Sequence, residues 1–591
     1  MPSILHERPT NMVVTRRLRK RPPTKATVRR TQLISTYGVG AVLPVESESF
    51  MIAGLDEWHP RELDAIHEPR LCDSLGVSRL YSPPGGDGEG MVPMVRFPEW
   101  VYCPQCSRLD KFWRIADKPK GEYVNKCRHC LTVRLVPSRF VSCCTAGHIQ
   151  DFPYRRWAHR GKESVEEGRH GLRITTDPGN STLGGITVSC SCGASQTLEG
   201  ALGRNALGRS CAGSSPWLGS DRDRCSEDLV GLQRGASNVW FADVRSALTV
   251  DRSLTKAEEA LERIRPELEG LTSPDLDLLL GIKARQHQVD ENALKDAYRK
   301  QADSPATKGE ATRILRADEY EALGRLHPER DGTETFVCVP SEIRHSDSTG
   351  GLLDLVSRVP KLREVRALRG FARVAAPTQE SGTARGRLSR GRTDWLPAVE
   401  VLGEGVFLRV REDALKKWEE TDFALGRALM LTRAIQSAAP EWVGAIEPVN
   451  PRSLLLHSLS HSLLNELALD TGYPASSIRE RVYSEPGQSG ILLYTATADA
   501  AGSLGGLCAQ GTIDNVKAIL ESAAERAQWC SADPVCLESM ATGTGAKNLA
   551  ACHSCLLIPE VSCELQNGML DRACLVGTEG EATAGFLTEV D

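Results

Sequence analysis

Cys103-Pro-Gln-Cys106 and Cys127-Arg-His-Cys130 are the two short stretches that decide how the first half of this chain folds. Each presents two thiols on a tight loop, and about twenty residues separate the loops, a spacing typical of a zinc ribbon. Four thiolates complete a tetrahedron around one Zn²⁺ ion and leave no open coordination position. We therefore expect these four cysteines to stabilise the fold and not to catalyse a reaction.

The next cysteines along the chain form a second group. Cys190-Ser-Cys192 supplies two thiols, and two more follow in the same loop-rich region. We predict that a second closed zinc site contains Cys190, Cys192, Cys211 and Cys225. Cys144 or His148 could replace one of these ligands, and the role of Cys143 stays open. In the alternative interpretation, several of these thiols are simply packed in a core.

The end of the chain carries a third group, with six cysteines at Cys530, Cys536, Cys552, Cys555, Cys563 and Cys574. We predict that its metal ligands are Cys536, Cys552, Cys555 and Cys563. Cys536 is preferred to Cys530 because it follows an Asp-Pro turn that can fix the loop presenting it. Zinc is the favoured metal, so the sequence predicts two to three Zn²⁺ ions in all. A [4Fe–4S] cluster is the alternative at this last group, since four cysteines can also hold one.

Cysteine usage also bears on the compartment. The chain has 19 cysteines in 591 residues, and clustered CxxC pairs act as metal ligands where the surroundings are reducing. Residues 1–14 include charged residues and prolines and lack the apolar segment of a secretion signal. No apolar run reaches the roughly eighteen residues that a membrane span needs. We therefore expect a cytoplasmic protein without membrane contact.

Composition changes along the chain indicate a multidomain α+β protein. Its N-terminal region is zinc-ribbon-like, and its C-terminal module is a mixed α/β metal-binding unit. An apolar helix over 453–469, a strand over 491–495 and a helix over 513–526 are expected in that module. The predicted regions are a flexible basic arm (1–30), a cysteine-rich zinc-binding region (31–250), a charged helical region (251–330), a middle α+β region with an Arg-rich segment (331–450) and the C-terminal cysteine-cluster domain (451–591).

Two basic segments stand out in a chain whose formal net charge is −5. The arm contains Arg16, Arg17, Arg19 and Lys20. The second segment contains Arg363, Arg366, Arg369 and Arg373, which would share one face if the segment were helical. Such stripes can contact phosphates of nucleic acid. A solvated or salt-bridged face is the alternative for the second segment.

Catalytic motifs are weak throughout. His457 and His461 lie four residues apart on the apolar helix, but Ser458 stands where a zinc protease has glutamate, so packed or hydrogen-bonded histidines are favoured. The segment 540–548 resembles a phosphate-binding loop until Asn548 replaces the magnesium-binding Ser/Thr. Cys508 lacks the pattern around a nucleophile and is expected to be a packed thiol. These features predict no catalytic residues.

Several motifs resemble a known family. Gln32 to Ala41, Ala53-Gly-Leu-Asp56, Gly147 to Pro153, Arg234-Gly-Ala-Ser-Asn238 and the stretch 362–368 are similar to DrmB proteins, core subunits of the bacterial DISARM anti-phage system. The C-terminal part, with Glu480-Arg-Val-Tyr483, the glycine turn 502–506 and its cysteines, resembles the cysteine module of MrfA-type DNA-repair helicases. In those helicases four cysteines hold a metal ion, which supports the third predicted site.

The resemblance implies partners. DrmB proteins work with DrmA, a helicase-like ATPase, and the pair engages DNA; a DISARM methyltransferase is a further candidate partner. The combined interpretation is a non-catalytic zinc-binding subunit that binds the helicase and helps to engage foreign DNA. The alternatives are a metal-dependent nuclease or hydrolase, and a DNA-sensing regulator with an iron–sulfur cluster.

Overall fold

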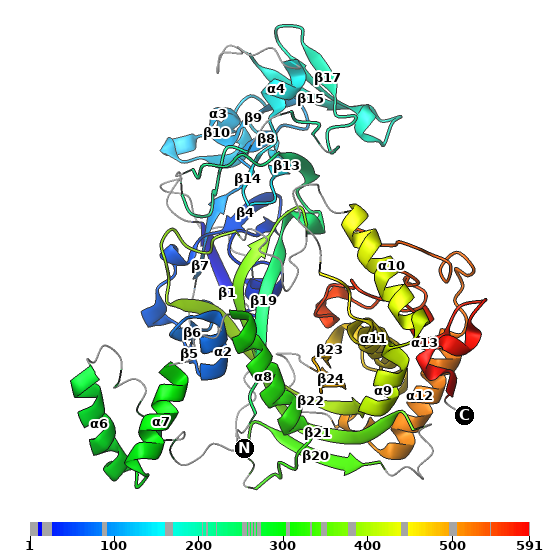
Figure 1. The fold of residues 1–591 in the computed structure, drawn as a ribbon. Coiled ribbons are helices and arrows are strands. Elements are labelled where there is room, and N and C mark those ends of the chain that lie inside the picture. Colours follow the sequence, from blue (N-terminus) through cyan, green and yellow to red (C-terminus); the bar gives the residue numbers. More distant parts are fainter. Residues whose placement is uncertain are drawn as a thin grey trace.

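A computed structural model gives the fold of the chain (Figure 1). The described residues are 10–14, 27–85, 91–159, 170–203, 205–208, 211–219, 222–250, 257, 260–261, 264, 268, 273–302, 308–330, 332, 334–343, 351–375, 386–438, 447–495, 505–543 and 545–589. Helices and several sheets alternate over these residues, which confirms a multidomain α+β architecture. Among these residues, no helix is both long and apolar enough to cross a membrane.

Two long antiparallel strands form the spine of the molecule, β21 (Leu353–Ala372) and β22 (Trp395–Val410). Their sheet has the order β19-β21-β22-β24-β23. The further members are β19 (Phe241–Leu248), β20 (Val337–Glu342), β23 (Ile478–Tyr483), β24 (Gly490–Thr495), β6 (Arg79–Tyr81) and β5 (Ala65–Ile66). One half of the spine packs in the C-terminal core through Val356, and the other half packs in the N-terminal core through Phe371. The spine therefore joins the two halves of the chain.

A second sheet lies beside the spine in the N-terminal half, in the order β2-β1-β7-β4-β3. Its strands are β1 (Thr10–Val14), β2 (Thr27–Val28), β3 (Val42–Val45), β4 (Glu48–Ile52) and β7 (Met91–Arg96), and the helices nearby are α1 (Gln32–Ser35) and α2 (Pro69–Leu75). Strand β1 pairs in parallel with β7, so residues 10–14 are not part of a flexible arm as predicted. The sequence signal was weak because the pairing is non-local.

Short strands build the zinc-ribbon-like head, drawn in cyan at the top of Figure 1. Its main sheet has the order β12-β8-β9-β15-β16-β17. Those strands are β8 (Trp100–Tyr102), β9 (Arg108–Lys111), β12 (Val136–Pro137), β15 (Leu172–Thr176), β16 (Ile186–Cys190) and β17 (Ser195–Thr197). Around it lie β10 (Ala116–Asp117), β11 (Val124–Cys127), β13 (Phe140–Cys143), β14 (Ile149–Asp151), β18 (Val230–Gln233), α3 (Phe112–Ile115) and α4 (Tyr154–His159).

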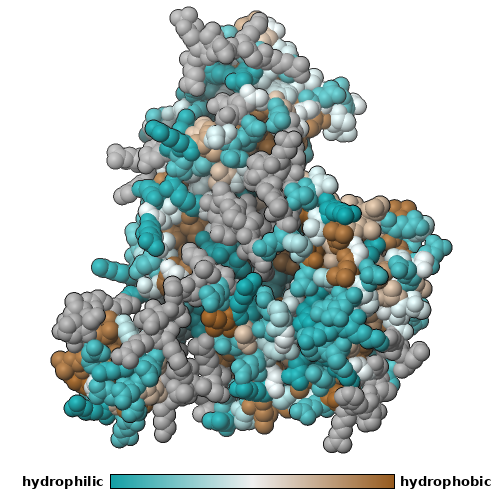
Figure 2. Space-filling view, viewed as in Figure 1, coloured by the Kyte–Doolittle hydropathy of each residue, from teal (hydrophilic) through white to brown (hydrophobic). Residues whose placement is uncertain are grey.

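The charged helical region divides into two parts. Helices α6 (Ser273–Gln286) and α7 (Glu291–Ala302) stand apart from the sheets in Figure 1, and Figure 2 shows apolar side chains on this pair. Leu278 of α6 is 67% exposed. Helix α8 (Lys308–Leu323) instead packs against the spine, where the buried Glu319 pairs with Arg481 of β23 at 3.1 Å. Helix α8 thus belongs structurally with the sheet.

The C-terminal module surrounds one buried helix, α11 (Pro451–Thr471), which contains the predicted 453–469. The side chain of Asn450 caps its start, and Gly472 ends it in the left-handed conformation (φ 71°). Residues 454–464 are buried without a break, including polar side chains such as Ser458 and Ser460, so this part of the helix is covered on all sides. Its neighbours are α9 (Glu412–Glu419), α10 (Asp422–Ala438), α12 (Ile513–Ala527) and α13 (Ala573–Val576). The strand and the helix predicted near 491–495 and 513–526 are confirmed as β24 and α12.

Candidate metal centres

Within the described residues, five groups of side chains bring four possible metal ligands together, with all ligand atoms of a group within 4.8 Å of one another. Three groups lie in the cysteine-rich head or next to it, and two lie in the C-terminal module. The groups are Cys103/Cys106/Cys127/Cys130, Cys144/His148/Cys211/Cys225, His159/His170/Cys190/Cys192, Cys530/Cys536/Cys552/Cys555 and His457/His461/Glu480/Cys563.

The structure brings the first predicted set together without change. The Cys103 and Cys130 sulfur atoms lie 3.8 Å apart, as do those of Cys106 and Cys127. A tetrahedron with Zn–S bonds of about 2.3 Å places its sulfur atoms about 3.8 Å apart. Backbone hydrogen bonds from Ser107 to Cys103 (2.8 Å) and from Leu131 to Cys127 (2.7 Å) close the two loops. The geometry suits one four-coordinate ion.

The second predicted set is wrong as a single site, because the structure divides its members between two groups. Cys190 ends β16 and Cys192 lies on the turn to β17, which faces His159 at the end of α4. Cys211 and Cys225 lie instead beside Cys144, at the end of β13. Sequence order could not separate the two pairs because residues far apart in the chain complete both groups.

The group at the end of β13 contains Cys144, His148, Cys211 and Cys225. Cys144 Sγ lies 4.0 Å from Cys225 Sγ and 3.5 Å from Nδ1 of His148. The other ring nitrogen of His148 lies 3.2 Å from the Asp223 carboxylate, which orients the ring. Hydrogen bonds with Cys144 and, secondarily, with His148 outweigh the effect of burial and lower the pKa of the Cys211 thiol to about 4. Cys211 is therefore ready to act as a thiolate ligand.

The group between α4 and β16 uses two histidines that sequence analysis missed. His159 Nε2 lies 3.2 Å from Cys192 Sγ, and His170 Nδ1 lies 3.2 Å from Cys190 Sγ. His159 donates its Nδ1–H to the Arg155 carbonyl at 2.7 Å, so its Nε2 lone pair points at the group. The one usable signal was that His170 lies just before the strand pair β15–β16 that presents the cysteines.

The C-terminal cysteine group differs from the prediction by one residue, because Cys530 takes the place predicted for Cys563. Cys530 and Cys552 sulfur atoms lie 3.4 Å apart, and those of Cys536 and Cys555 lie 3.7 Å apart. Asp533 explains the correction: its carboxylate accepts the backbone N–H of Cys530 at 2.8 Å and that of Leu537 at 3.2 Å. This turn directs both of its cysteines to one centre.

Cys563 instead belongs to the fifth group. There it meets both histidines of α11 and Glu480 of β23, and all four side chains are buried. His457 Nε2 is 2.9 Å from Glu480 and 3.2 Å from Cys563, and His461 Nε2 is 3.3 Å from Glu480. Burial opposes protonation of His461, but the Glu480 carboxylate outweighs it and raises the pKa of His461 to about 9. Both histidines are therefore buried and hydrogen-bonded, and they also lie in a group that could hold a metal ion.

The predicted arginine stripe is not a helical face, because Arg363, Arg366, Arg369 and Arg373 all lie on strand β21. Their guanidinium groups are engaged within the protein. Arg363 pairs with Glu400 at 2.6 Å and Arg369 with Asp243 at 3.0 Å, and their side chains are 12% and 15% exposed. Arg366 pairs with Glu364 at 2.6 Å. Buried Arg373 donates to three backbone carbonyls. The phosphate-contact interpretation of this segment is wrong, and its salt-bridged alternative holds.

The arm residues Arg16, Arg17, Arg19 and Lys20 lie outside the described residues. At the end of the segment 540–548, Asn548 is buried and engaged within the protein: it donates to the Asn567 carbonyl at 2.7 Å and accepts from the Leu570 N–H at 3.0 Å. Burial raises the pKa of the Cys508 thiol to about 11, which is unfavourable for a nucleophile.

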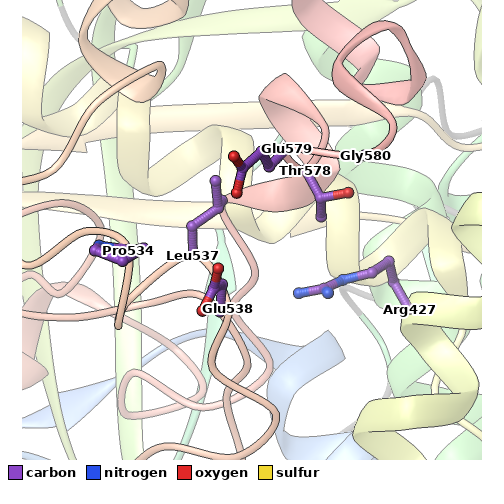
Figure 3. A pocket seen from close by; sticks show the side chains of 7 residues that line it. All are labelled: Arg427, Pro534, Leu537, Glu538, Thr578, Glu579 and Gly580. Carbon is purple, nitrogen blue, oxygen red and sulfur yellow. The ribbon is translucent and has the colours of Figure 1, made fainter.

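A hollow of about 290 Å³ lies near the C-terminal cysteine group (Figure 3). Its charged lining consists of Arg427, Glu538 and Glu579, and Figure 3 shows that these side chains come from three separate segments. Arg427 is already paired with the buried Asp571 at 2.7 Å. Among the described residues, no histidine or cysteine lines this hollow. Its lining therefore offers neither a thiol nor an imidazole.

Comparison with known proteins agrees with this geometry. Residues 29–241 match a domain family of unknown function, DUF8724, and residues 459–556 match the MrfA Zn-binding domain. The DISARM protein DrmB of Bacillus paralicheniformis is 30% identical over 562 residues, which cover 90% of this chain and 97% of that protein. The second match spans α12 and the cysteines from Cys530 to Cys555. By this similarity across nearly its whole length, the chain belongs to the DrmB family of DISARM proteins.

Proposed function

We propose that this chain is a non-catalytic, zinc-binding subunit that binds a helicase-like ATPase partner of the DrmA type and helps to engage DNA during anti-phage restriction in the cytoplasm. The observation that carries the proposal is the near full-length similarity to a DISARM protein, combined with a MrfA-type zinc-binding domain around the C-terminal cysteines. Four cysteine-rich groups with closed geometry support a scaffold whose metals maintain the fold.

Single zinc ions fit these groups better than a four-iron cluster. In a [4Fe–4S] cluster the cysteines bind different irons, so their sulfur atoms stand farther apart than four ligands that share one ion. The sulfur atoms of Cys530, Cys552, Cys536 and Cys555 approach one another to 3.4–3.7 Å. This spacing supports zinc at the C-terminal group.

DNA contact is assigned to the zinc ribbon together with the arm residues Arg16, Arg17, Arg19 and Lys20. Residues 103–134 contain eight Lys/Arg and three Asp/Glu, although the whole chain has a net charge of −5. Lys120, Lys126 and Arg128 are exposed there. Besides burial, the charges of Arg108 and Arg128 lower the pKa of His129, which reflects the positive potential of this surface. A basic surface on a rigid ribbon can contact phosphates without reading sequence.

The DNA assignment is tested by reversing two ribbon charges. In the complex with its ATPase partner, Lys120→Glu/Lys126→Glu should weaken DNA binding several-fold. The DNA-binding constant should also fall less steeply with salt concentration, by the equivalent of about one to two phosphate contacts. The matched control, Lys416→Glu/Arg433→Glu, changes the same charge at exposed positions of α9 and α10. Equal DNA binding by the ribbon variant and wild type would refute this assignment.

The partner interface is assigned to the turn that carries Cys530 and Cys536. Trp529, Val535 and Met540 are 71%, 77% and 67% exposed. Large apolar side chains held on a stable loop are typical of the central part of protein interfaces. Trp529→Ala should reduce co-purification of the ATPase while the zinc content stays unchanged. The control is Leu469→Ala, which removes a side chain on α11 that is 62% exposed.

A further inference from the structure

His457, His461, Glu480 and Cys563 form a buried quartet separate from the four cysteine-rich groups. The two histidines lie one turn apart on α11, so both rings project from the same face of the helix. Glu480 comes from β23, and Cys563 comes from the segment after the last CxxC loop. Three parts of the C-terminal module therefore meet at this point.

Three separations within the quartet lie at or slightly below those expected of ligands on one ion. With bonds of about 2.0 Å to nitrogen and oxygen and about 2.3 Å to sulfur, neighbouring ligand atoms of a tetrahedron lie roughly 3.3 to 3.5 Å apart. His457 Nε2 lies 3.2 Å from Cys563 Sγ and 2.9 Å from Glu480 Oε1. His461 Nε2 lies 3.3 Å from the same carboxylate oxygen.

Separate hydrogen bonds orient every member of the quartet. His457 donates its Nδ1–H to the Met569 carbonyl at 3.0 Å, and His461 donates its own to the Leu556 carbonyl at 2.8 Å. Both Nε2 atoms therefore face the centre, as in metal-bound histidines whose outer nitrogen is hydrogen-bonded to a carbonyl. Ser460 donates to the second oxygen of Glu480.

Cys563 is held in the same way. Its sulfur accepts the backbone N–H groups of Leu565 at 3.3 Å and of Asn567 at 3.2 Å. Two N–H donors stabilise a thiolate, which is the form of cysteine that binds metal. With no ion present, the neutral histidines would direct their Nε2 lone pairs at a carboxylate and a thiolate. One shared cation would satisfy all four of these inward-facing ligand atoms.

We propose that this quartet binds one structural Zn²⁺ ion through His457 Nε2, His461 Nε2, a Glu480 oxygen and Cys563 Sγ. Two nitrogens, one oxygen and one sulfur suit zinc, which accepts all three donor types. Because the four side chains are 0–4% exposed, the ion has no open route for a substrate and serves to hold α11, β23 and the C-terminal segment together. The proposal is independent of the partner and DNA assignments.

Native mass spectrometry of the full chain tests this proposal by counting bound ions. Cys563→Ala should bind one zinc ion fewer than wild type, and Glu480→Gln should lose the same ion at lower concentrations of chelator than wild type. Cys563→His, which supplies a replacement ligand, should restore the wild-type count. Cys574→Ala is the matched control, since Cys574 is buried in the same core but belongs to none of the five groups found among the described residues.

Folded Cys563→Ala and Glu480→Gln proteins that keep the wild-type zinc count and chelator resistance would overturn the proposal. If Cys563→Ala does not fold, the test rests on Glu480→Gln and on the zinc count of the wild-type protein. Five zinc ions per wild-type chain support the site. Four ions, with the same chelator resistance in Glu480→Gln as in wild type, contradict it.

Discussion

Around the first cysteine group, the described residues form a buried apolar cluster of seven, two of which are the ligands Cys103 and Cys127. The core that contains α11 has forty-two buried members. A metal ion bound by the first group would therefore supply folding free energy that so small a core lacks. In the C-terminal module the apolar core is far larger, and a metal bound by Cys530, Cys536, Cys552 and Cys555 would fasten loops to it. We therefore expect metal binding to contribute a larger share of the folding free energy in the ribbon than in the C-terminal module.

The largest expected effect is the loss of a ribbon ligand. Cys127→Ser should remove one zinc ion and unfold residues 103–135, because the remaining apolar contacts cannot maintain the hairpins. Limited proteolysis followed by mass spectrometry should show new cleavage in this segment, with α11 and α12 still protected. A ribbon that stays protected from proteolysis without zinc would contradict the claim that its apolar core is too small to fold without metal.

Removing one partner of the buried ion pair between α8 and β23 should have the next largest effect. Arg481→Met leaves Glu319, which is fully buried, without its guanidinium partner. The free energy of unfolding should fall by about 3–5 kcal/mol, measured by urea denaturation. The matched control, Arg325→Met, breaks an exposed pair with Glu321 and should change stability by about 0–1 kcal/mol. Equal effects of the two changes would show that this junction is not part of the core.

A C-terminal ligand should matter less than its ribbon counterpart. Cys552→Ser should remove one zinc ion and loosen the loop 529–556, while the core around α11 remains folded. Hydrogen exchange should rise in that loop and stay slow in α11. By contrast, Leu463→Ala should destabilise the core by about 2–5 kcal/mol with no loss of zinc. Global unfolding of the module by Cys552→Ser would show that its metal is as essential as the ribbon's.

The last predicted effect is a pH dependence within the head. Burial, and secondarily the charge of Glu99, raise the pKa of Asp151 to about 7. Since the folded state then binds a proton that the unfolded chain has already released, this contribution to stability falls as pH rises from about 4 to about 7. Asp151→Asn can still accept the N–H groups of Glu99 and Trp100, so it should flatten the slope. Thermal melts at pH 5–8 test this; unchanged slopes would refute it.

Sequence reasoning succeeded where the signal was local. Two CxxC loops at ribbon spacing identified Cys103 to Cys130, and the apolar run 453–469 identified α11. It failed where distant segments meet. Nothing near Cys192 indicates that His159 completes its group, and nothing near Cys563 indicates that it lies with His457 and not with the other C-terminal cysteines.

The arginine segment failed for a different reason. Its three- and four-residue spacing imitates a helix, but Val365, Ala367 and Leu368 are buried in a strand that is covered on both faces. A strand covered on both faces does not show a clean two-residue alternation of polar and apolar residues. Each arginine there also has an internal partner that the linear sequence cannot reveal.

Elemental analysis of the purified full-length chain tests the central claim, that closed single-ion sites scaffold this DrmB-family protein, most directly. The account predicts zinc as the only tightly bound transition metal, at four or more equivalents per chain and with no visible absorbance. Well-folded protein with less than one equivalent of zinc, or with bound iron and the broad visible absorbance of an iron–sulfur cluster, would contradict it.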